Sequence, residues 1–277
     1  MSEQSVYDAI KHWEQQWIDY QPNDFEIAYD RWLQQGFHQM NPRKRKKLFR
    51  QMDQILFHIH AYLQGAAFQN EARERILVSG RIFDRSIVEI AHMKQLTVDQ
   101  LTYIAQQHVA KGKVYSLAQG GLTGTGGYLL LGADFPLMVV LNLRAVQLIG
   151  LTFGHEVNHP YEMMLSLKLF HVATLPKRLQ KQGWDALKQE LTHYSSPFMY
   201  EGTDDLTDEK WFEQPMKQCL KSLSIFMFRK KWIQGLPVIS MAIGATLNYR
   251  LTRQVTEFAL RFYQYRYLIE EENFRYV

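Results

Sequence analysis

Apolar residues recur at intervals of three and four along most of the chain, which is the spacing of one face of an α-helix. The first such stripe consists of Val6, Ile10, Trp13, Trp17 and Tyr20. Later stripes with the same spacing begin at Leu48, Leu101, Phe212 and Val255. No stretch alternates with the period of two that is typical of β-strands. The pattern therefore predicts an all-α protein folded as a multi-helix bundle.

Local signals place some of the helix ends. Thr97 and Gln100 have the spacing of a capping box, which predicts that a helix begins directly after Thr97. Arg253, Glu257 and Arg261 recur at intervals of four, which puts them on one exposed helix face. We expect an N-terminal helical region over residues 1–80 and a helical domain over residues 81–277, together forming one compact unit.

Two segments carry no formal charge: the 20 residues from Val114 to Ala133 and the 18 residues from Trp232 to Tyr249. A membrane-spanning helix needs about 20 predominantly apolar residues. Both segments reach that length only by including Gly, Ser, Thr, Gln and Asn, so neither is a clean transmembrane helix. The mean hydropathy of −0.31 likewise favours a soluble protein.

Small residues recur at helical spacing within these segments. Ser116, Gly120, Gly124 and Gly127 fall on one face of the first, and the second has small residues at 240 and 244. Such residues let two helix backbones approach closely. The sequence therefore predicts two glycine-faced helices, Ser116–Gly127 and Ser240–Asn248, that pack together as a glycine-rich central helical hairpin. A buried helix pair, contact with a membrane and a groove for a partner helix all fit this pattern.

The net charge is only +4, but the basic residues are clustered, as in Arg43–Lys47 and Arg229–Lys231. Such clusters suit phosphate-bearing partners or form solvated helix faces. No RNP motif, zinc module or recognition-helix pattern is present, so we expect no nucleic-acid partner. Cys219 is the single cysteine, which fits a reducing compartment. The N-terminus lacks signal-peptide features, so we expect a cytoplasmic protein that is peripheral at the inner face of the membrane.

One motif suggests a different function. His155-Glu156-Val157-Asn158-His159 matches the H-E-x-x-H signature of zinc hydrolases, in which both histidines lie on one helix. Pro160 follows the second histidine, and the residue before a proline is disfavoured in a helix. We therefore expect the motif to lie on a turn, with Pro160 in the first turn of the next helix. The candidates for a third ligand are Glu162, His171, Glu190 and His193.

Two blocks resemble a known family. The first, AQGGLTGTGGYLLLGADFPLMVVLNLRAVQLIGLTFG (118–154), resembles the glycine-rich core of the EcsC family, and LPVISMAIGATLNYRLTRQVTEFALRFYQYRYL (236–268) resembles its second block. The resemblance covers roughly residues 85–270. The matching positions of the two blocks are Gly120, Gly121, Gly124, Gly126, Gly127, Asp134, Pro136, Pro237, Gly244 and Asn248.

The resemblance implies a role but no chemistry. The family has no established catalytic residues, metal or cofactor, so we expect none here. Its name comes from a bacterial operon that also encodes an ABC transporter connected with secretion. The resemblance therefore implies a non-catalytic, membrane-proximal accessory protein that contacts the membrane surface or a transporter subunit, through the ten matching positions and the basic residues Arg229, Lys230 and Lys231. A zinc metallohydrolase that uses HEVNH is the alternative.

Overall fold

The computed structural model describes residues 3–21, 24, 66–123, 127–175, 177–193 and 237–275. Its helices are α1 (Glu3–Ile18), α4 (Ala66–Arg81), the 3-10 helix η1 (Ile90–Gln95), α5 (Val98–Thr123), α6 (Gly127–Thr152), α7 (Pro160–Thr174), α8 (Lys177–His193) and α10 (Pro237–Arg275). These residues contain no strand, and the predicted all-α multi-helix bundle is confirmed.

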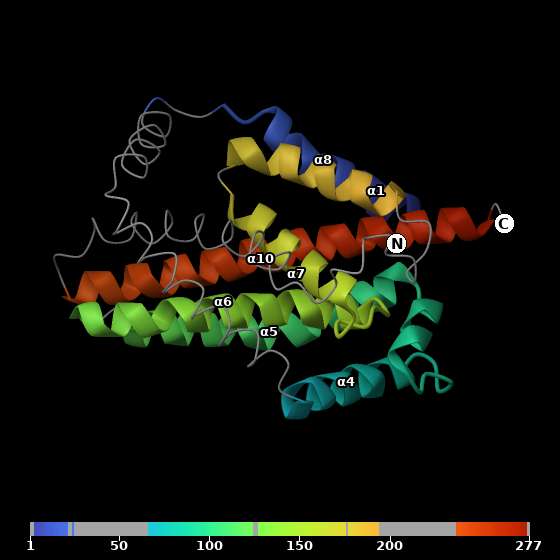
Figure 1. The fold of residues 1–277 in the computed structure, drawn as a ribbon, viewed down its shortest axis with the longest axis horizontal. Helices are drawn as coiled ribbons and strands as arrows, with labels where there is room; N and C mark the ends of the chain where they lie inside the picture. The colour runs from blue at the N-terminus through green and yellow to red at the C-terminus, as the bar shows by residue number, and fades with distance from the viewer. Residues whose placement is uncertain are drawn as a thin grey trace, which may run out of the picture.

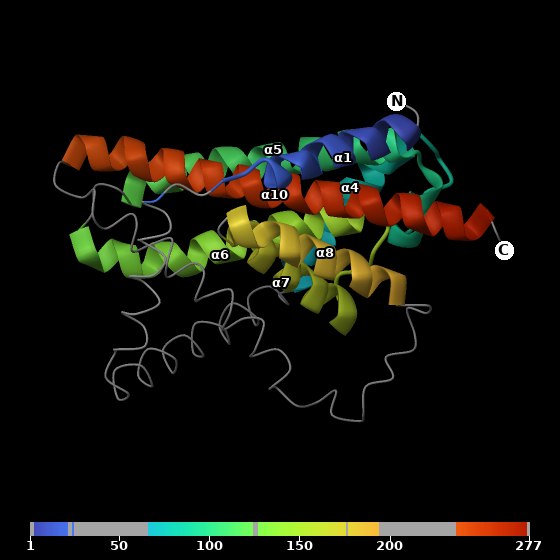
Figure 2. The same cartoon turned by 90° about the horizontal axis from the view of Figure 1, so that it is seen from above.

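Three long helices, α5, α6 and α10, lie side by side along the length of the molecule (Figures 1 and 2). The 39 residues of α10 form the longest of them, about 58 Å at 1.5 Å per residue. Their contact is apolar, with Leu101, Val146 and Phe262 among the fully buried side chains. Helices α1 and α8 cover one side of this layer, and α4 lies on the other (Figure 1).

The predicted N-terminal helix is confirmed as α1, whose apolar stripe is buried against α8 and α10. The Trp13 ring lies 4.4 Å from Trp17 and 5.2 Å from Trp184 between centroids. Two polar contacts fix this aromatic cluster: the Trp17 indole N–H donates to Gln180 at 3.1 Å, and the Trp184 indole N–H donates to Glu14 at 2.5 Å. The aromatic cluster thus attaches α1 to the body of the protein.

The predicted capping box is also confirmed. The Thr97 backbone N–H donates to the Gln100 side-chain oxygen at 3.0 Å, and the Gln100 backbone N–H donates to the Thr97 hydroxyl at 3.4 Å. These reciprocal bonds satisfy amides that have no partner inside the helix. They fix the start of α5 at the residue expected from the sequence.

The expectation of one helix over 116–127 was wrong. Helix α5 ends at Thr123 and α6 begins at Gly127, so the four small residues do not share a single helix face. Helix α6 then continues through Asp134 and Pro136. The hairpin's glycine packing and the division at residue 80 stay predictions. Other expected features lie outside the described residues, namely Gly124, Gly126, the helix stripes from Leu48 and Phe212, Cys219 and the basic residues at 43–47 and 229–231.

Candidate functional site

The H-E-x-x-H motif lies on the turn between α6 and α7, as predicted. Helix α6 ends at Thr152, and His159 has the extended backbone of an N-cap residue (φ −72°, ψ 138°). Pro160 is the first residue of α7, where its missing N–H costs no helical hydrogen bond. The two histidines of the motif therefore do not share a helix.

Gly154 determines how closely this turn approaches η1. Its φ of +81° is in the left-handed region that favours glycine. A Cβ at this position would lie 2.5 Å from Lys94 Cγ and 3.2 Å from the Lys94 backbone nitrogen. One turn earlier, a Cβ on Gly150 would lie 2.7 Å from the Tyr263 hydroxyl. Both glycines thus let polar groups from other elements come close to the end of α6.

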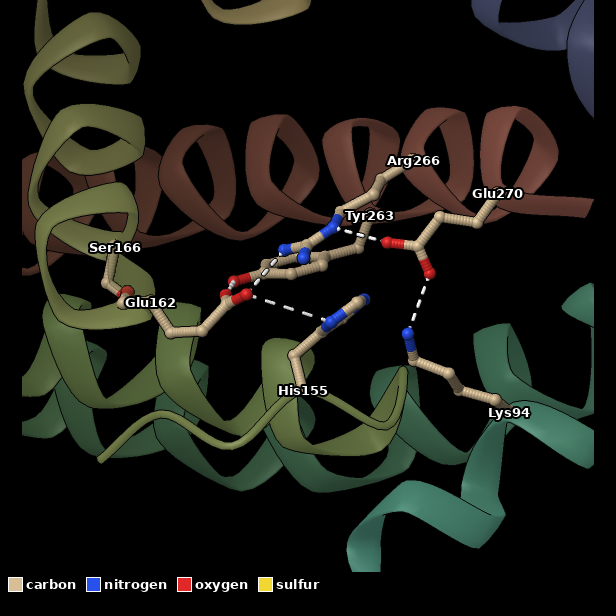
Figure 3. Close-up of polar contacts among 7 residues, drawn as sticks. All are labelled: Lys94, His155, Glu162, Ser166, Tyr263, Arg266 and Glu270. Atoms are coloured by element: carbon tan, nitrogen blue, oxygen red, sulfur yellow. Dashed lines mark hydrogen bonds and ion pairs between the residues drawn. The ribbon is translucent and has the colours of Figure 1, made fainter. Parts of the chain in front are cut away.

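Glu162, in the first turn of α7, is the centre of a buried set of polar side chains (Figure 3). Arg266 Nη1 donates to Glu162 Oε1 at 2.7 Å, and the Tyr263 hydroxyl donates to Oε2 at 3.4 Å. His155 Nδ1 lies 3.7 Å from Oε1, which is beyond hydrogen-bond distance. The Ser166 hydroxyl donates to the Glu162 carbonyl at 2.8 Å.

A second carboxylate extends this set towards the surface. Arg266 Nε donates to Glu270 Oε1 at 2.8 Å, and Lys94 Nζ donates to Glu270 Oε2 at 2.7 Å (Figure 3). The Arg266 guanidinium also lies over the Tyr161 ring, 5.8 Å from its centroid. We call Lys94, His155, Glu162, Ser166, Tyr263, Arg266 and Glu270 the polar junction. It joins η1, the α6–α7 turn, α7 and α10.

The charges of the polar junction balance. Burial lowers the pKa of His155 well below its usual 6.5, helped by the positive charges of Arg266 and Lys94, so the ring is neutral. Burial raises the pKa of the Tyr263 phenol, which stays a donor. Burial opposes the charged form of Glu270 too, but Arg266 and Lys94 outweigh it and lower the Glu270 pKa. Two carboxylates therefore face two cations.

The polar junction is closed to solvent at its centre. Only 6% of His155, 5% of Glu162 and 8% of Arg266 is exposed. Buried charges are tolerated when they are paired and hydrogen-bonded, and here they are paired with each other. This arrangement orients four elements relative to one another, and its central groups are not placed to receive a substrate.

The residues of the motif do not fit a catalytic zinc site. Glu156 forms a two-bond ion pair with Arg73 of α4, in which Arg73 Nη2 donates to Oε1 at 2.8 Å. His159 is exposed, whereas His155 is buried beside Glu162. Glu190, a candidate third ligand, accepts two bonds from Lys168 at 2.7 Å. Over the described ranges, no three His, Cys, Asp or Glu side chains are grouped closely enough to hold a metal ion.

Sequence reasoning identified only part of this site. It placed Glu162 at the start of a helix, but it did not connect Glu162 with Tyr263 and Arg266, about 100 residues later. The available signal was Arg266, a charged residue four positions after Phe262 and next to Tyr265 on an otherwise apolar stripe. That signal does not say which acid Arg266 meets.

A second feature lies at the opposite end of the three long helices. The last turns of α5 (114–123), the first turns of α6 (127–143) and the first turns of α10 (237–249) meet at the left of Figure 1. Asp134 is the only formally charged residue in these three ranges. We call them the uncharged end. Among the described helices, none is both long enough and apolar enough to span a bilayer.

Most of the predicted contact residues map to the uncharged end. Gly120 and Gly121 lie in the last turn of α5, and the rest of those described are Gly127, Asp134 and Pro136 on α6 and Pro237, Gly244 and Asn248 on α10. Asn248 is buried, and its Nδ2 has no hydrogen-bond partner among the described residues. The Asn248 amide thus lies inside the uncharged end with no hydrogen-bond acceptor among the described residues.

Basic residues adjoin the uncharged end on α5, α6 and α10. The hydrogen bond from Gln264 to Thr102 aligns α10 with α5, which runs the opposite way. Lys113 lies eleven residues beyond Thr102, and Arg253 lies eleven residues before Gln264, so the two are at the same level along the bundle. We call the basic residues within four positions of the three ranges, Lys111, Lys113, Arg144, Arg250 and Arg253, the basic collar.

The fold places this chain in the class of all-α helical bundles. Sequence comparison then identifies its family. A model of the EcsC protein family matches residues 4–268, so the chain belongs to the EcsC family. This match begins within α1, well before residue 85, where the resemblance seen in the sequence began. No solved structure matches the chain.

Two curated relatives come from Bacillus subtilis (strain 168). The uncharacterized protein YdbA is 26% identical over 152 residues, which is 55% of this chain and 52% of YdbA. Protein EcsC is 23% identical over 175 residues, which is 63% of this chain and 67% of EcsC. The matched region thus spans about half of YdbA and about two thirds of EcsC.

Proposed function

We propose that this protein is a non-catalytic accessory protein that docks on an anionic membrane surface through its uncharged end and basic collar. The observation that supports the proposal is that five basic residues directly adjoin, along α5, α6 and α10, three helix ends that carry a single acid, Asp134. Cytoplasmic leaflets are rich in anionic lipids, and a basic residue near such a surface contributes about 1 kcal/mol.

The dimensions fit insertion into one leaflet. The 13 uncharged residues at the start of α10 rise about 20 Å, compared with about 30 Å for the hydrocarbon core. An apolar end of this length reaches into the headgroup region and the outer part of one leaflet. Basic residues behind it then lie at the level of the phosphates, where their charge is favoured.

Co-sedimentation with vesicles tests this proposal. We expect binding to vesicles of phosphatidylcholine and phosphatidylglycerol in equal parts, and little binding to phosphatidylcholine alone. The variant Arg250→Glu/Arg253→Glu reverses two exposed charges of the basic collar, and glutamate is as good a helix former as arginine. Its affinity for the anionic vesicles should fall by about tenfold or more.

A matched control separates location from net charge. Arg75→Glu/Arg85→Glu makes the same charge change at exposed positions on α4 and the loop after it. This control should bind the anionic vesicles nearly as well as the original protein. Equal losses in both variants, or equal binding to neutral and anionic vesicles, would overturn the proposal.

We further propose that docking serves an ABC-transport or secretion system, because this is the setting that the family's name implies. Reconstituting a transporter's membrane subunits in phosphatidylcholine vesicles distinguishes the two kinds of contact. If the chain binds these vesicles but not protein-free anionic ones, a transporter subunit and not the lipid is the docking partner.

A further inference from the structure

A cleft of about 450 Å³ lies among α1, α5 and α10, away from the polar junction. Its floor is apolar and includes Ala105, Val109 and Leu260. One face of α10 supplies charged groups to its wall, namely Arg253, Glu257 and Arg261. The sequence predicted that these three residues share an exposed helix face, and the structure adds that this face borders a cavity. The volume is within the range of small-molecule sites, about 300–1,000 Å³.

Arg261 is the unusual group in this cleft. It is half-buried, and its hydrogen bond is to a neutral partner: Nη1 donates to Gln264 Oε1 at 3.3 Å. Gln264 in turn donates to the Thr102 hydroxyl at 2.9 Å, which fixes its amide. Among the described residues, no carboxylate forms an ion pair with Arg261. Burial accordingly lowers the pKa of this guanidinium, and the charge of Glu257 only partly opposes the shift.

The contrast with Arg266, five residues along the same helix, shows what Arg261 lacks. Arg266 is buried and bonded to two carboxylates. A half-buried guanidinium with one neutral hydrogen-bond partner keeps N–H donors for a ligand in the cleft. A guanidinium presents several N–H groups in a plane, which suits a carboxylate that accepts two bonds.

We propose that the cleft binds a small amphiphilic monocarboxylate. Its carboxylate accepts hydrogen bonds from Arg261, with Arg253 nearby, and its short apolar body lies along Ala105, Val109 and Leu260. Two arginines and one glutamate give the wall a net charge of +1, which a single negative charge balances. Arg253 belongs to both the cleft and the basic collar, whereas Arg261 belongs to the cleft alone, so Arg261 variants test the cleft separately from membrane docking.

Calorimetric titration with octanoate tests the proposal, with octanol as the uncharged probe of similar shape. We expect octanoate to bind and octanol to bind at least about tenfold more weakly, because octanol cannot accept a charge-assisted hydrogen bond as a carboxylate does. Arg261→Gln should weaken octanoate binding by about the same factor. Arg261→Lys should fall between the two, since it keeps the charge but loses the two-bond geometry.

Two further measurements keep the test decisive. Arg85→Gln, at an exposed site outside the cleft, is the matched control and should bind octanoate normally. Without ligand, Arg261→Gln should unfold at the same temperature as the original protein or higher, which shows that it folds. Equal octanoate affinities for Arg261→Gln and Arg85→Gln, or no octanoate binding, would overturn the inference. Arg261→Gln should still bind anionic vesicles, so either proposal can fail alone.

Discussion

Glu162 and Arg266 lie 104 residues apart in the sequence and form the buried ion pair of the polar junction. Glu162→Gln removes the carboxylate and leaves part of the Arg266 charge unmatched in the interior. We expect this variant to lose about 3–5 kcal/mol of unfolding free energy, measured by urea denaturation. The double variant Glu162→Gln/Arg266→Met should recover much of the loss, because it removes the buried charge as well.

An ion pair on the surface provides the comparison for the Glu162 and Arg266 variants. Lys181 and Asp185 are one helical turn apart on α8 and 3.0 Å from each other, and Asp185 also lies 3.2 Å from Lys188. Asp185→Asn should cost only about 1 kcal/mol or less. Similar losses for Glu162→Gln and Asp185→Asn would show that the polar junction does not stabilise the fold in the way described.

The neutral state of His155 predicts how stability depends on pH. Its folded pKa lies well below the usual 6.5, so between these values the unfolded chain binds a proton that the folded protein does not. Unfolding free energy should therefore fall as pH drops below about 6.5. Burial also lowers the pKa of His171, which adds a contribution of the same sign. The carboxyl of Glu270, with its lowered pKa, loses its contribution only below its usual value of 4.5.

Urea titrations at several pH values between 7 and 5 check this prediction. His155→Gln should show a smaller loss of unfolding free energy across the range, whatever its stability at neutral pH. The control is His159→Gln, whose exposed ring stays in water in both states. A pH slope that is unchanged in His155→Gln would contradict the assignment of a buried, neutral imidazole.

The turn that carries His155 could be predicted from the sequence, because Gly154 and Pro160 act on the backbone beside them. The partners of Glu162 could not, because the side chains that donate to it, Tyr263 and Arg266, come from α10. Contacts over such distances depend on how whole helices pack. A motif can be recognised in a sequence when its residues are close together in the chain. The residues of the polar junction are spread from position 94 to position 270.

At the level of helices, α1 is attached to α8 and α10 through the face that carries its aromatic stripe. Trp17 is 7% exposed and the adjacent Ile18 is 59% exposed. Trp17→Ala should cost about 3–5 kcal/mol, because it removes a buried indole and leaves a cavity beside Trp13 and Trp184. Ile18→Ala should change the unfolding free energy by about 0.5 kcal/mol or less. Equal effects in urea denaturation would mean that α1 does not dock through its aromatic stripe.

Helices were predicted correctly where the sequence contains a regular apolar stripe or a capping box. The start of α5 followed from Thr97 and Gln100, and α1 followed from its apolar spacing. Prediction failed across residues 116–127, because small residues at intervals of three and four are compatible with one helix and also with two helices joined by a short connection. Glycine favours both close helix packing and chain reversal, so spacing alone cannot separate these outcomes.

On the scale of the whole molecule, the two ends of the long-helix layer differ in chemistry. One end is held by the polar junction, whose charges are paired internally. The other end has almost no charge and is bordered by the basic collar. The cleft with Arg261 lies between them, since it is lined by α5 residues before the collar and by α10 residues from Arg253, a collar residue, onwards. Docking on a membrane would transfer only the uncharged end from water into lipid and would leave the polar junction as it is.

This division predicts a specific pattern of amide hydrogen exchange. With anionic vesicles present, exchange should slow in peptides from 114–123, 127–137 and 237–249, because lipid excludes water from these helix ends. Peptides from 154–166, which contain the α6–α7 turn, should exchange as they do in solution. Phosphatidylcholine vesicles should give no protection at either end. Protection confined to α4 or α8 would place the docking surface elsewhere on the bundle, because those helices lie on the sides of the long-helix layer and not at its uncharged end.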